Sequence, residues 1–406
     1  MRLIDRDSGR LVFNSVIWIF LCCYFMQIFN LPNIITIAIG GILCLAMLLR
    51  QKKIRLDVET ILLILTMASY FMILYGTKAF FMSLPYVGVL IYVLAHYLVY
   101  EVKLCAEQSE KYFIILLFTI VVGYSLHGIL NSYLFIDKQW QYGVNRLWMD
   151  IWEQWYLPGT WQVIFFLPAF AFVFPAIIYF RKRKLINVCV FLSSVLFIYI
   201  GLASQTRTPI LAFPIVFVAQ MILYLILERK KVSALAKNRK VQIAAGIIIG
   251  GLIAAAVVLA KHPVVSSFIS ILGRDGGVFN NIRFKLHREG LKQLFVYPMG
   301  GYQMHFLGYP HAHNTWIDIA DAAGVIPFFL FAVYTFLTVY ELIVWLTKKE
   351  ISIERKLMVS GLYGIFFLYY TVERGLGGSM HYMTPWYFVN AMVHGELTMI
   401  KKQKKE

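Results

Sequence analysis

The chain has 406 residues, of which 60% are hydrophobic and only 15% are charged. This composition argues against a soluble globular domain, because such domains do not combine so little charge with so much apolar sequence. The formal net charge is +17, but it does not indicate a nucleic-acid partner, since Lys and Arg collect in short segments between apolar runs.

Apolar runs that are long enough to cross a bilayer as helices follow one another along the chain. They are continuous, unlike the alternating segments of about ten residues that build a membrane β-barrel. We therefore predict an all-α, polytopic membrane protein with about 12 transmembrane helices, and a single integral membrane domain over residues 1–406. The runs cover residues 11–29, 31–49, 58–76, 79–100, 112–134, 162–180, 185–203, 210–227, 241–260, 316–346, 357–372 and 385–400.

The distribution of positive charge predicts the orientation of these spans. The first run follows Arg2, Arg6 and Arg10 and lacks a small-residue cleavage signature, so we expect it to be retained in the membrane. When the N-terminus is placed in the cytoplasm, 27 of the 38 Lys and Arg residues fall on the cytoplasmic side, which is the bias of the positive-inside rule. Both termini are therefore predicted to be cytoplasmic, and residues 261–314 form a long outer loop between spans 9 and 10.

A second outer segment, residues 135–161, holds five of the nine tryptophans. Trp148, Trp152 and Trp155 are spaced i, i+4 and i+7, as on one face of a helix. This stripe predicts an amphipathic helix at the level of the lipid headgroups, where indole rings favour the interface. A platform that stacks on sugars or covers a lipid tail is the alternative, and both interpretations can hold together.

The eighth apolar run is preceded by the polar stretch SQTR, residues 204–207. A charge so close to hydrocarbon is costly unless it reaches water or a partner, so Arg207 either extends to the interface or binds an anion. Thr208 and Pro209 are typical of a helix start, where negative charge is attracted. Guanidinium groups can hold phosphate oxygens bidentately, which makes Arg207 a candidate phosphate ligand.

The long outer loop contains NNIRFKLHREGLKQLFVYPMGG, residues 280–301. Asn280 or Asn281 can cap a helix that runs to about Val296, and the Pro-Met-Gly-Gly stretch ends it. At about 100° per residue one face carries Lys285, Arg288 and Lys292, and another carries Arg283, His287, Gly290 and Leu294. The first face predicts a solvated surface, whereas Arg283 shares its face with a glycine that permits another group to approach closely.

The tenth run begins with GYPHAHNTWIDIADAAG, residues 308–324, which is unusually polar for a membrane helix. Thr315 can cap this helix, with Asp318 in a capping-box position. Gly324 and Pro327 predict a loosened or kinked helix, which a membrane protein tolerates where the helix lines a cavity.

Two histidines, His311 and His313, precede this helix at its water-exposed end. A neutral imidazole can accept a proton from a hydroxyl at physiological pH, so a general base is the favoured interpretation. A zinc ion bound by these two histidines would need a third ligand from another part of the chain. A metal bound by Asp318 and Asp321 is a weak alternative, because no further carboxylate stands nearby in the sequence.

Three motifs occur in order along the second half of the chain: SQTRTPILAF, RFKLHREGLKQLFVYPMGG and HAHNTWIDIADAAGVIPFFLF. Together they resemble the bacterial O-antigen ligase and O-antigen polymerase family. That family has an Arg at the start of a span, an Arg-led helix ending near Pro-x-x-Gly, and a His-Asn pair followed by glycines. The resemblance covers residues 195–345. The sequence departs from the family pattern at His287, Ile317 and Pro327, where tryptophan, leucine and glycine are common.

The resemblance implies a glycosyltransferase in the cytoplasmic (inner) membrane of a bacterium. It would move glycan from an undecaprenyl diphosphate carrier to the hydroxyl of a glycan or lipid-linked acceptor, without a metal or cofactor and with inversion of the anomeric carbon. His313 would be the general base, and Arg207 and Arg283 would stabilise the diphosphate leaving group. The expected substrate-binding residues are His311, Asn314, Arg288 and Arg274, and the last two are the alternatives should Arg283 not hold the diphosphate.

The alternative function is a flippase or transporter for lipid-linked sugar, which does no chemistry. Transporters tend to have repeat symmetry and charged or broken spans at mid-membrane, whereas the polar motifs of this chain cluster at one face. Within the family, a ligase and a polymerase need the same base and arginines. The sequence therefore does not separate these two activities.

Overall fold

The structure, a computed structural model, describes residues 2–26, 33–51, 57–76, 86–102, 109–136, 147–149, 151, 156–203, 207–236, 282–373 and 383–404. The ninth apolar run, residues 241–260, and the candidate ligand Arg274 lie outside these residues. All statements about structure below concern the described part of the chain.

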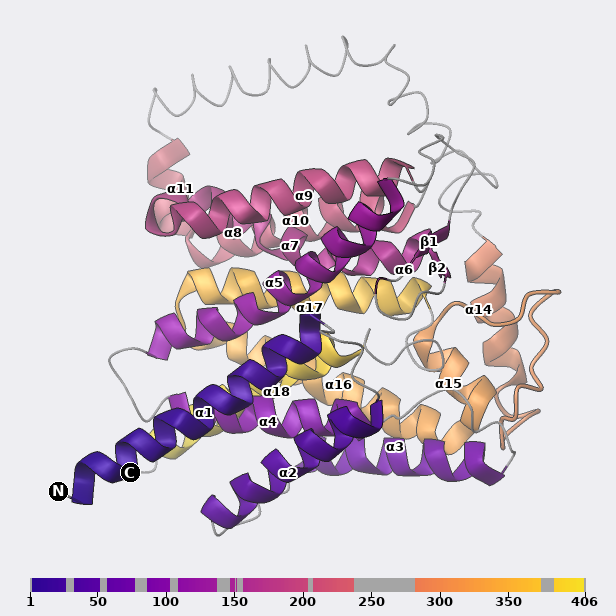
Figure 1. The fold of residues 1–406 in the computed structure, drawn as a ribbon. Coiled ribbons are helices and arrows are strands. Elements are labelled where there is room, and N and C mark those ends of the chain that lie inside the picture. Colours follow the sequence, from indigo (N-terminus) through magenta and orange to yellow (C-terminus); the bar gives the residue numbers. More distant parts are fainter. Residues whose placement is uncertain are drawn as a thin grey trace.

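The described residues are almost entirely helical, which confirms the predicted all-α class (Figure 1). Most apolar runs coincide with one helix each, and the run 58–76 has the same bounds as α3. The helices are α1 (Arg2–Met26), α2 (Asn33–Gln51), α3 (Val58–Gly76), α4 (Tyr86–Val102), α5 (Ser109–Ile136), α6 (Gly159–Ile164), α7 (Leu167–Ala171), α8 (Val173–Ile178), α9 (Lys184–Ala203), α10 (Arg207–Leu227), α11 (Arg229–Ala236), α14 (Ile282–Gln293), α15 (Thr315–Ala323), α16 (Val325–Thr347), α17 (Ile353–Val372) and α18 (Thr384–Gln403).

Two of the predicted spans are interrupted. The run 162–180 is divided among the short helices α6, α7 and α8 and the start of a 3-10 helix, Phe180–Lys182. Pro168 and Pro175 each lack the N–H that would continue the backbone ladder. The tenth run is divided into α15 and α16 at Gly324, which adopts a φ of 86°. The break that Gly324 predicts is therefore confirmed.

The helix predicted from the tryptophan spacing is wrong at Trp148. Residues Leu147–Met149 form strand β1, which pairs antiparallel with β2 (Tyr156–Pro158), and Trp148 lies opposite Leu157. Large apolar and aromatic side chains favour strands as well as membrane interfaces, so the spacing alone did not decide between the two structures. Trp152 and Trp155 lie outside the described residues.

Helix α18 lies in the middle of the bundle and packs against α4, α16 and α17. The fully buried ring of Trp386, near the start of α18, contacts the rings of Phe331, Tyr334, Tyr363 and Tyr370. Around this aromatic centre, α3 packs on α16, α5 packs on α1, and α10 packs on α17. The buried core of the described bundle therefore draws on helices from both halves of the chain, with Trp386 of α18 at an aromatic centre.

The buried amide of Gln220, on α10, joins three helices. Its Nε2 donates to the carbonyl oxygens of Ala171 at the end of α7 and Leu357 of α17, both at 2.7 Å. Pro175 has no N–H to offer the carbonyl of Ala171, so the glutamine supplies the missing donor. Gly361 leaves room for this amide, because a side chain at that position would collide with Gln220.

The two ends of the helix bundle carry different segments (Figure 1). Both termini and α11 lie at the left end in this view, whereas α14, the beginning of α15 and the β1–β2 hairpin lie at the right end. The segments predicted to be cytoplasmic thus share one end, and the described parts of the predicted outer segments share the other. These ends are called the basic end and the histidine end below.

Within the residues that the structure describes, two helical stretches, Tyr112–Ser132 and Val325–Thr347, are long and apolar enough to cross a membrane. Several helices also expose large apolar side chains around the outside of the bundle. Examples with more than half of the side chain exposed are Ile42 and Leu49 on α2, Leu185 and Leu192 on α9, and Phe336 on α16.

Candidate functional site

Helix α14 approaches α15 closely through a glycine. Gly290 is buried against Ile317, and a side chain at position 290 would collide with that isoleucine. This is the close approach that Gly290 predicts. Because Arg283 shares a face of α14 with Gly290, the contact turns Arg283 toward the beginning of α15.

The Pro298–Gly301 turn fixes the start of residues 302–314, the segment that is called the histidine loop below. The amide of Val325 donates to the carbonyl oxygen of Pro298 at 2.9 Å. Gly300 and Gly324, with φ values of 70° and 86°, lie so close together that neither position has space for a side chain. The loop of residues 302–314 therefore starts from a fixed point at the α15–α16 junction.

Asn314 is the N-cap of α15. Its Oδ1 accepts the amide of Ile317 at 3.1 Å, and its Nδ2 donates to the carbonyl oxygen of Thr371 at the end of α17, at 3.2 Å. The cap predicted at Thr315 is one residue too late, because Asn314 has the extended backbone that capping requires and Thr315 is already helical. The Thr315 hydroxyl instead donates to the carbonyl oxygen of Glu373 at 3.1 Å.

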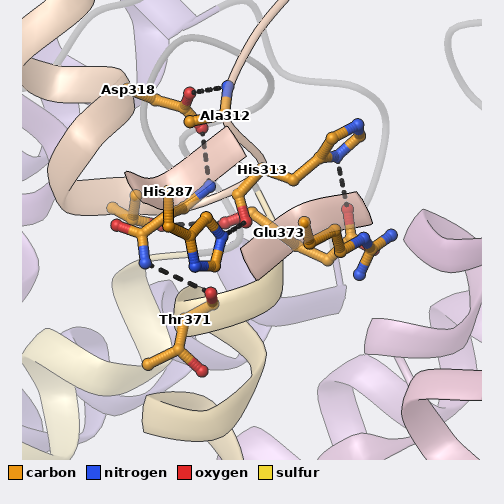
Figure 2. Close-up of polar contacts among 9 residues, drawn as sticks. His287, Ala312, His313, Asp318, Thr371 and Glu373 are labelled. Atoms are coloured by element: carbon orange, nitrogen blue, oxygen red, sulfur yellow. Dashed lines mark hydrogen bonds and ion pairs between the residues drawn. The ribbon is translucent and has the colours of Figure 1, made fainter. Parts of the chain in front are cut away.

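Asp318 holds the backbone on both sides of His313. One carboxylate oxygen accepts the amide of Ala312 at 2.8 Å, and the other accepts the amide of Asn314 at 3.1 Å. His313 between them has a φ of 56°, a left-handed conformation that is uncommon for a residue other than glycine. Such a conformation persists only where neighbouring contacts impose it. Asp318 therefore fixes the position of the histidine as well as the start of the helix (Figure 2).

The side chain of Glu373, directly after α17, forms the centre of the cluster. It is only 3% exposed, and its Oε1 accepts from a terminal nitrogen of Arg283 at 2.7 Å. Its second oxygen, Oε2, lies 3.6 Å from Nδ1 of His313. Arg283 on α14, His313 before α15 and Glu373 after α17 thus come from three separate segments and meet at one point, and Figure 2 shows His313 beside Glu373. We call these three residues the Arg-His-Glu cluster.

Charge within the cluster favours an ionised carboxylate. Burial raises the pKa of Glu373, but the Arg283 guanidinium and His313 together outweigh burial, so this pKa lies below its usual value. His287 is half-buried beside them, with its Nε2 3.4 Å from the carbonyl oxygen of His313. Burial and the nearby Arg283 lower the pKa of His287 below its usual value, which favours the neutral imidazole.

The structure brings four of the candidate residues together: Arg283, His311, His313 and Asn314. The ring centres of His311 and His313 are 4.2 Å apart. Arg288 lies on the exposed face of α14, as predicted for the basic stripe, and does not belong to this group. The nearby Asp321 accepts the amide of Met304 at 3.0 Å, so it stabilises the loop.

Arg207 is the first residue of α10. The bond from Gln220 to Leu357 fixes α10 beside α17, and Arg207 lies thirteen residues before Gln220, which is about 20 Å of helix. Glu373 lies sixteen residues after Leu357, and α17 runs in the direction opposite to α10. The backbone of Arg207 is therefore at the same end of the bundle as Glu373, which is the histidine end.

Glu373 is the member of the cluster that the sequence motifs did not predict. It lies outside the three motifs, about sixty residues after His313. One signal was present, because Glu373 directly follows the apolar run 357–372, at an end predicted to face the outside, where a carboxylate needs a partner. No protein-family model and no curated protein matches this chain.

Proposed function

We propose that this protein is a membrane glycosyltransferase of the O-antigen ligase or polymerase type. It transfers glycan from an undecaprenyl diphosphate carrier to an acceptor hydroxyl at the outer face of the bacterial cytoplasmic membrane. The observation that carries this proposal is the Arg-His-Glu cluster, in which a histidine, an ionised carboxylate and a guanidinium meet at one end of an apolar helical bundle.

The surface of the bundle supports a location in the membrane. Large apolar side chains cover the outward faces of α2, α9, α10 and α16, and contiguous exposed patches of this kind are rare on soluble monomers. Lys and Arg are concentrated in the segments at the basic end, as the positive-inside rule expects for a cytoplasmic face. The histidine end then faces the outside.

The pairing of His313 with Glu373 supports general-base chemistry. The carboxylate faces Nδ1 of the imidazole, so a proton on Nδ1 leaves Nε2 able to accept one from the acceptor hydroxyl. Glu373 stabilises the imidazolium that forms, as a buried carboxylate does in catalytic triads. The 3.6 Å separation is longer than a hydrogen bond, and we expect it to shorten when substrate binds, as contacts between catalytic groups often do.

In the proposed reaction, the acceptor oxygen attacks the anomeric carbon from the side opposite the diphosphate. The bond between this carbon and the diphosphate oxygen breaks, and the anomeric centre is inverted. The hydroxyl proton passes to Nε2 of His313, and the diphosphate leaves with the bonding electron pair.

Arginines support the departure of the diphosphate. A guanidinium presents five N–H donors in a planar fork, and Arg283 is held in the cluster by its contact with Glu373. Arg207 at the start of α10 adds a second cation at the same end. Fixed cations that face the developing negative charge stabilise the transition state without reorganisation.

The lipids of a deletion strain test this function directly. Loss of a polymerase is expected to leave carrier-linked single repeats, and loss of a ligase is expected to leave carrier-linked long chains. Mass spectrometry of extracted glycolipids distinguishes the two, with the complemented strain as the control. Accumulation of single repeats only on the cytoplasmic face of the membrane would instead identify a flippase and contradict the proposal.

Cysteine labelling tests the orientation. In a variant without native cysteines, Gln303→Cys in the exposed histidine loop is expected to react with a membrane-impermeant maleimide added to intact cells. Ser233→Cys, exposed on α11, should react only after the cells are opened. Labelling of Ser233→Cys alone in intact cells would place the Arg-His-Glu cluster in the cytoplasm and exclude extracellular transfer.

A further inference from the structure

A second cluster of ionisable side chains lies toward the basic end of the bundle. Its members come from four helices: Asp57 precedes α3, Glu59 is in its first turn, and His96, Glu341 and His394 belong to α4, α16 and α18. Glu341 is sixteen residues along α16 from Val325, which is about 24 Å of helix. The cluster is therefore well separated from the Arg-His-Glu cluster and takes no part in the proposed reaction.

His394 is at the centre of this group. Its Nε2 lies 3.0 Å from Oδ2 of Asp57. On the other side of the ring, Nδ1 lies 2.7 Å from Oε1 of Glu341 and 3.5 Å from Oε2 of Glu59. The ring of His96 lies beside that of His394, with 5.3 Å between their centres.

Among the described residues, the three carboxyl groups of this cluster outnumber the cationic groups that contact them. In the described part of the chain, Asp57, Glu59 and Glu341 have ion pairs only with His394, and no Lys or Arg contacts them. Glu59 and Glu341 are buried, with less than a tenth of each residue exposed. Burial of unbalanced charge is costly, so a further cation would stabilise this group strongly.

We propose that Asp57, His96 and His394 bind a divalent transition-metal ion such as Zn²⁺. One ligand atom from each of the three lies within 4.8 Å of the other two. Two histidines and one carboxylate form a common ligand set for zinc and for other divalent transition metals. The ion supplies the positive charge that the cluster lacks and joins α4 and α18 to the beginning of α3.

The spacing of the ligand atoms suits such an ion. Bonds of about 2.0–2.1 Å in tetrahedral geometry place two ligand atoms about 3.3 Å apart. The gap between Nε2 of His394 and Oδ2 of Asp57 is 3.0 Å, so the ion enters after a shift of a few tenths of an ångström. Both atoms lie at the ends of side chains, which can make that shift.

Two further groups fit the surroundings of a metal site. A histidine that binds metal through one nitrogen usually donates the other N–H to a carboxylate, and Glu341 lies at 2.7 Å from Nδ1 of His394 for that role. The hydroxyl of Tyr92, one helical turn before His96, is fully buried and has no hydrogen-bond partner among the described residues. The carboxyl groups of Asp57, Glu59 and Glu341 are near enough to interact with it electrostatically. The hydroxyl can bond to a water that completes the coordination.

Metal content and thermal stability of the purified full-length protein test this site. After exposure to Zn²⁺ and removal of unbound metal, mass spectrometry is expected to find a single equivalent of zinc per chain. Zinc should also raise the melting temperature of chelator-treated protein, because a ligand that binds only the folded state stabilises it. Less than half an equivalent of zinc together with an unchanged melting temperature would overturn the proposal.

Three variants assign the zinc to these ligands. His394→Ala and Asp57→Asn should lose both the bound zinc and the melting-temperature response, and Glu341→Gln should weaken zinc binding by about 10–100-fold. His305→Ala, an exposed histidine in the histidine loop, is the matched control and should behave as the wild type. Zinc that remains on His394→Ala would be adventitious and would overturn the assignment. If the variants do not fold, the response of the wild-type protein still decides the question.

Discussion

Replacement of His313 by asparagine is expected to slow glycan transfer by about 10²–10⁴-fold, the usual loss when a general base is removed. Asparagine is the suitable substitute because it tolerates the left-handed backbone found at this position. The loop should therefore keep its conformation while the imidazole is lost. The measurement is transfer by the purified protein in liposomes, with a lipid-linked donor and a labelled acceptor.

His311→Asn is the matched control for this variant. It removes an imidazole whose ring centre lies only 4.2 Å from that of His313, and it should retain measurable transfer. A general base contributes more than about tenfold to the rate. If folded His313→Asn protein kept more than about a tenth of the wild-type rate, proton transfer would therefore have to be assigned to another group. A loss of similar size in both variants would indicate that the two rings act together in binding.

Replacement of Arg283 by alanine should abolish transfer and also destabilise the protein. It leaves Glu373, which is 3% exposed, as a buried carboxylate without its main partner. Loss of one member of a buried ion pair costs about 3–5 kcal/mol, and the 22% exposure of the Arg283 side chain argues for the lower part of that range. Unfolding by denaturant measures this loss, and Lys285→Ala, on the exposed face of α14, is the control.

The double variant Arg283→Ala with Glu373→Gln separates stability from chemistry. Neutral glutamine removes the unbalanced charge, so most of the lost stability should return. Transfer should remain absent, because the diphosphate still lacks the guanidinium and His313 lacks its carboxylate. If the double variant regained transfer, Arg283 would serve only to balance Glu373, and the diphosphate would have to be held by Arg207 or another cation.

The sequence predicted those features that depend on local patterns. The apolar runs gave most of the helices, because a segment that is apolar all round has few alternatives to a buried or lipid-facing helix. Gly324 predicted the break between α15 and α16, and Gly290 predicted close packing with a partner of unknown identity. Arg283 stood apart from the basic stripe of α14 by its angular position alone.

Other features depend on contacts between distant segments and were not predicted. Trp148 lies in a strand because a second strand pairs with it, which helical spacing cannot reveal. The N-cap of α15 falls on Asn314 and not on Thr315, since both residue types can cap and the backbone decides between them. Glu373 could not be joined to Arg283 and His313 before the end of α17 was placed beside α14 and α15.

The glutamine amide that links α7, α10 and α17 has a consequence for how the protein can change shape. Inside an apolar bundle no water replaces a broken hydrogen bond, so sliding α10 along α17 by one helical turn would break both bonds of Gln220 and take from the Ala171 carbonyl the donor that Pro175 cannot supply. Such a slide would move Arg207 by about 5.4 Å relative to Glu373. The position of the Arg207 backbone relative to Glu373 is thus set by bonds that lie thirteen residues from Arg207 and sixteen residues from Glu373, and we expect motions that admit a bulky substrate to occur in the loops at the histidine end.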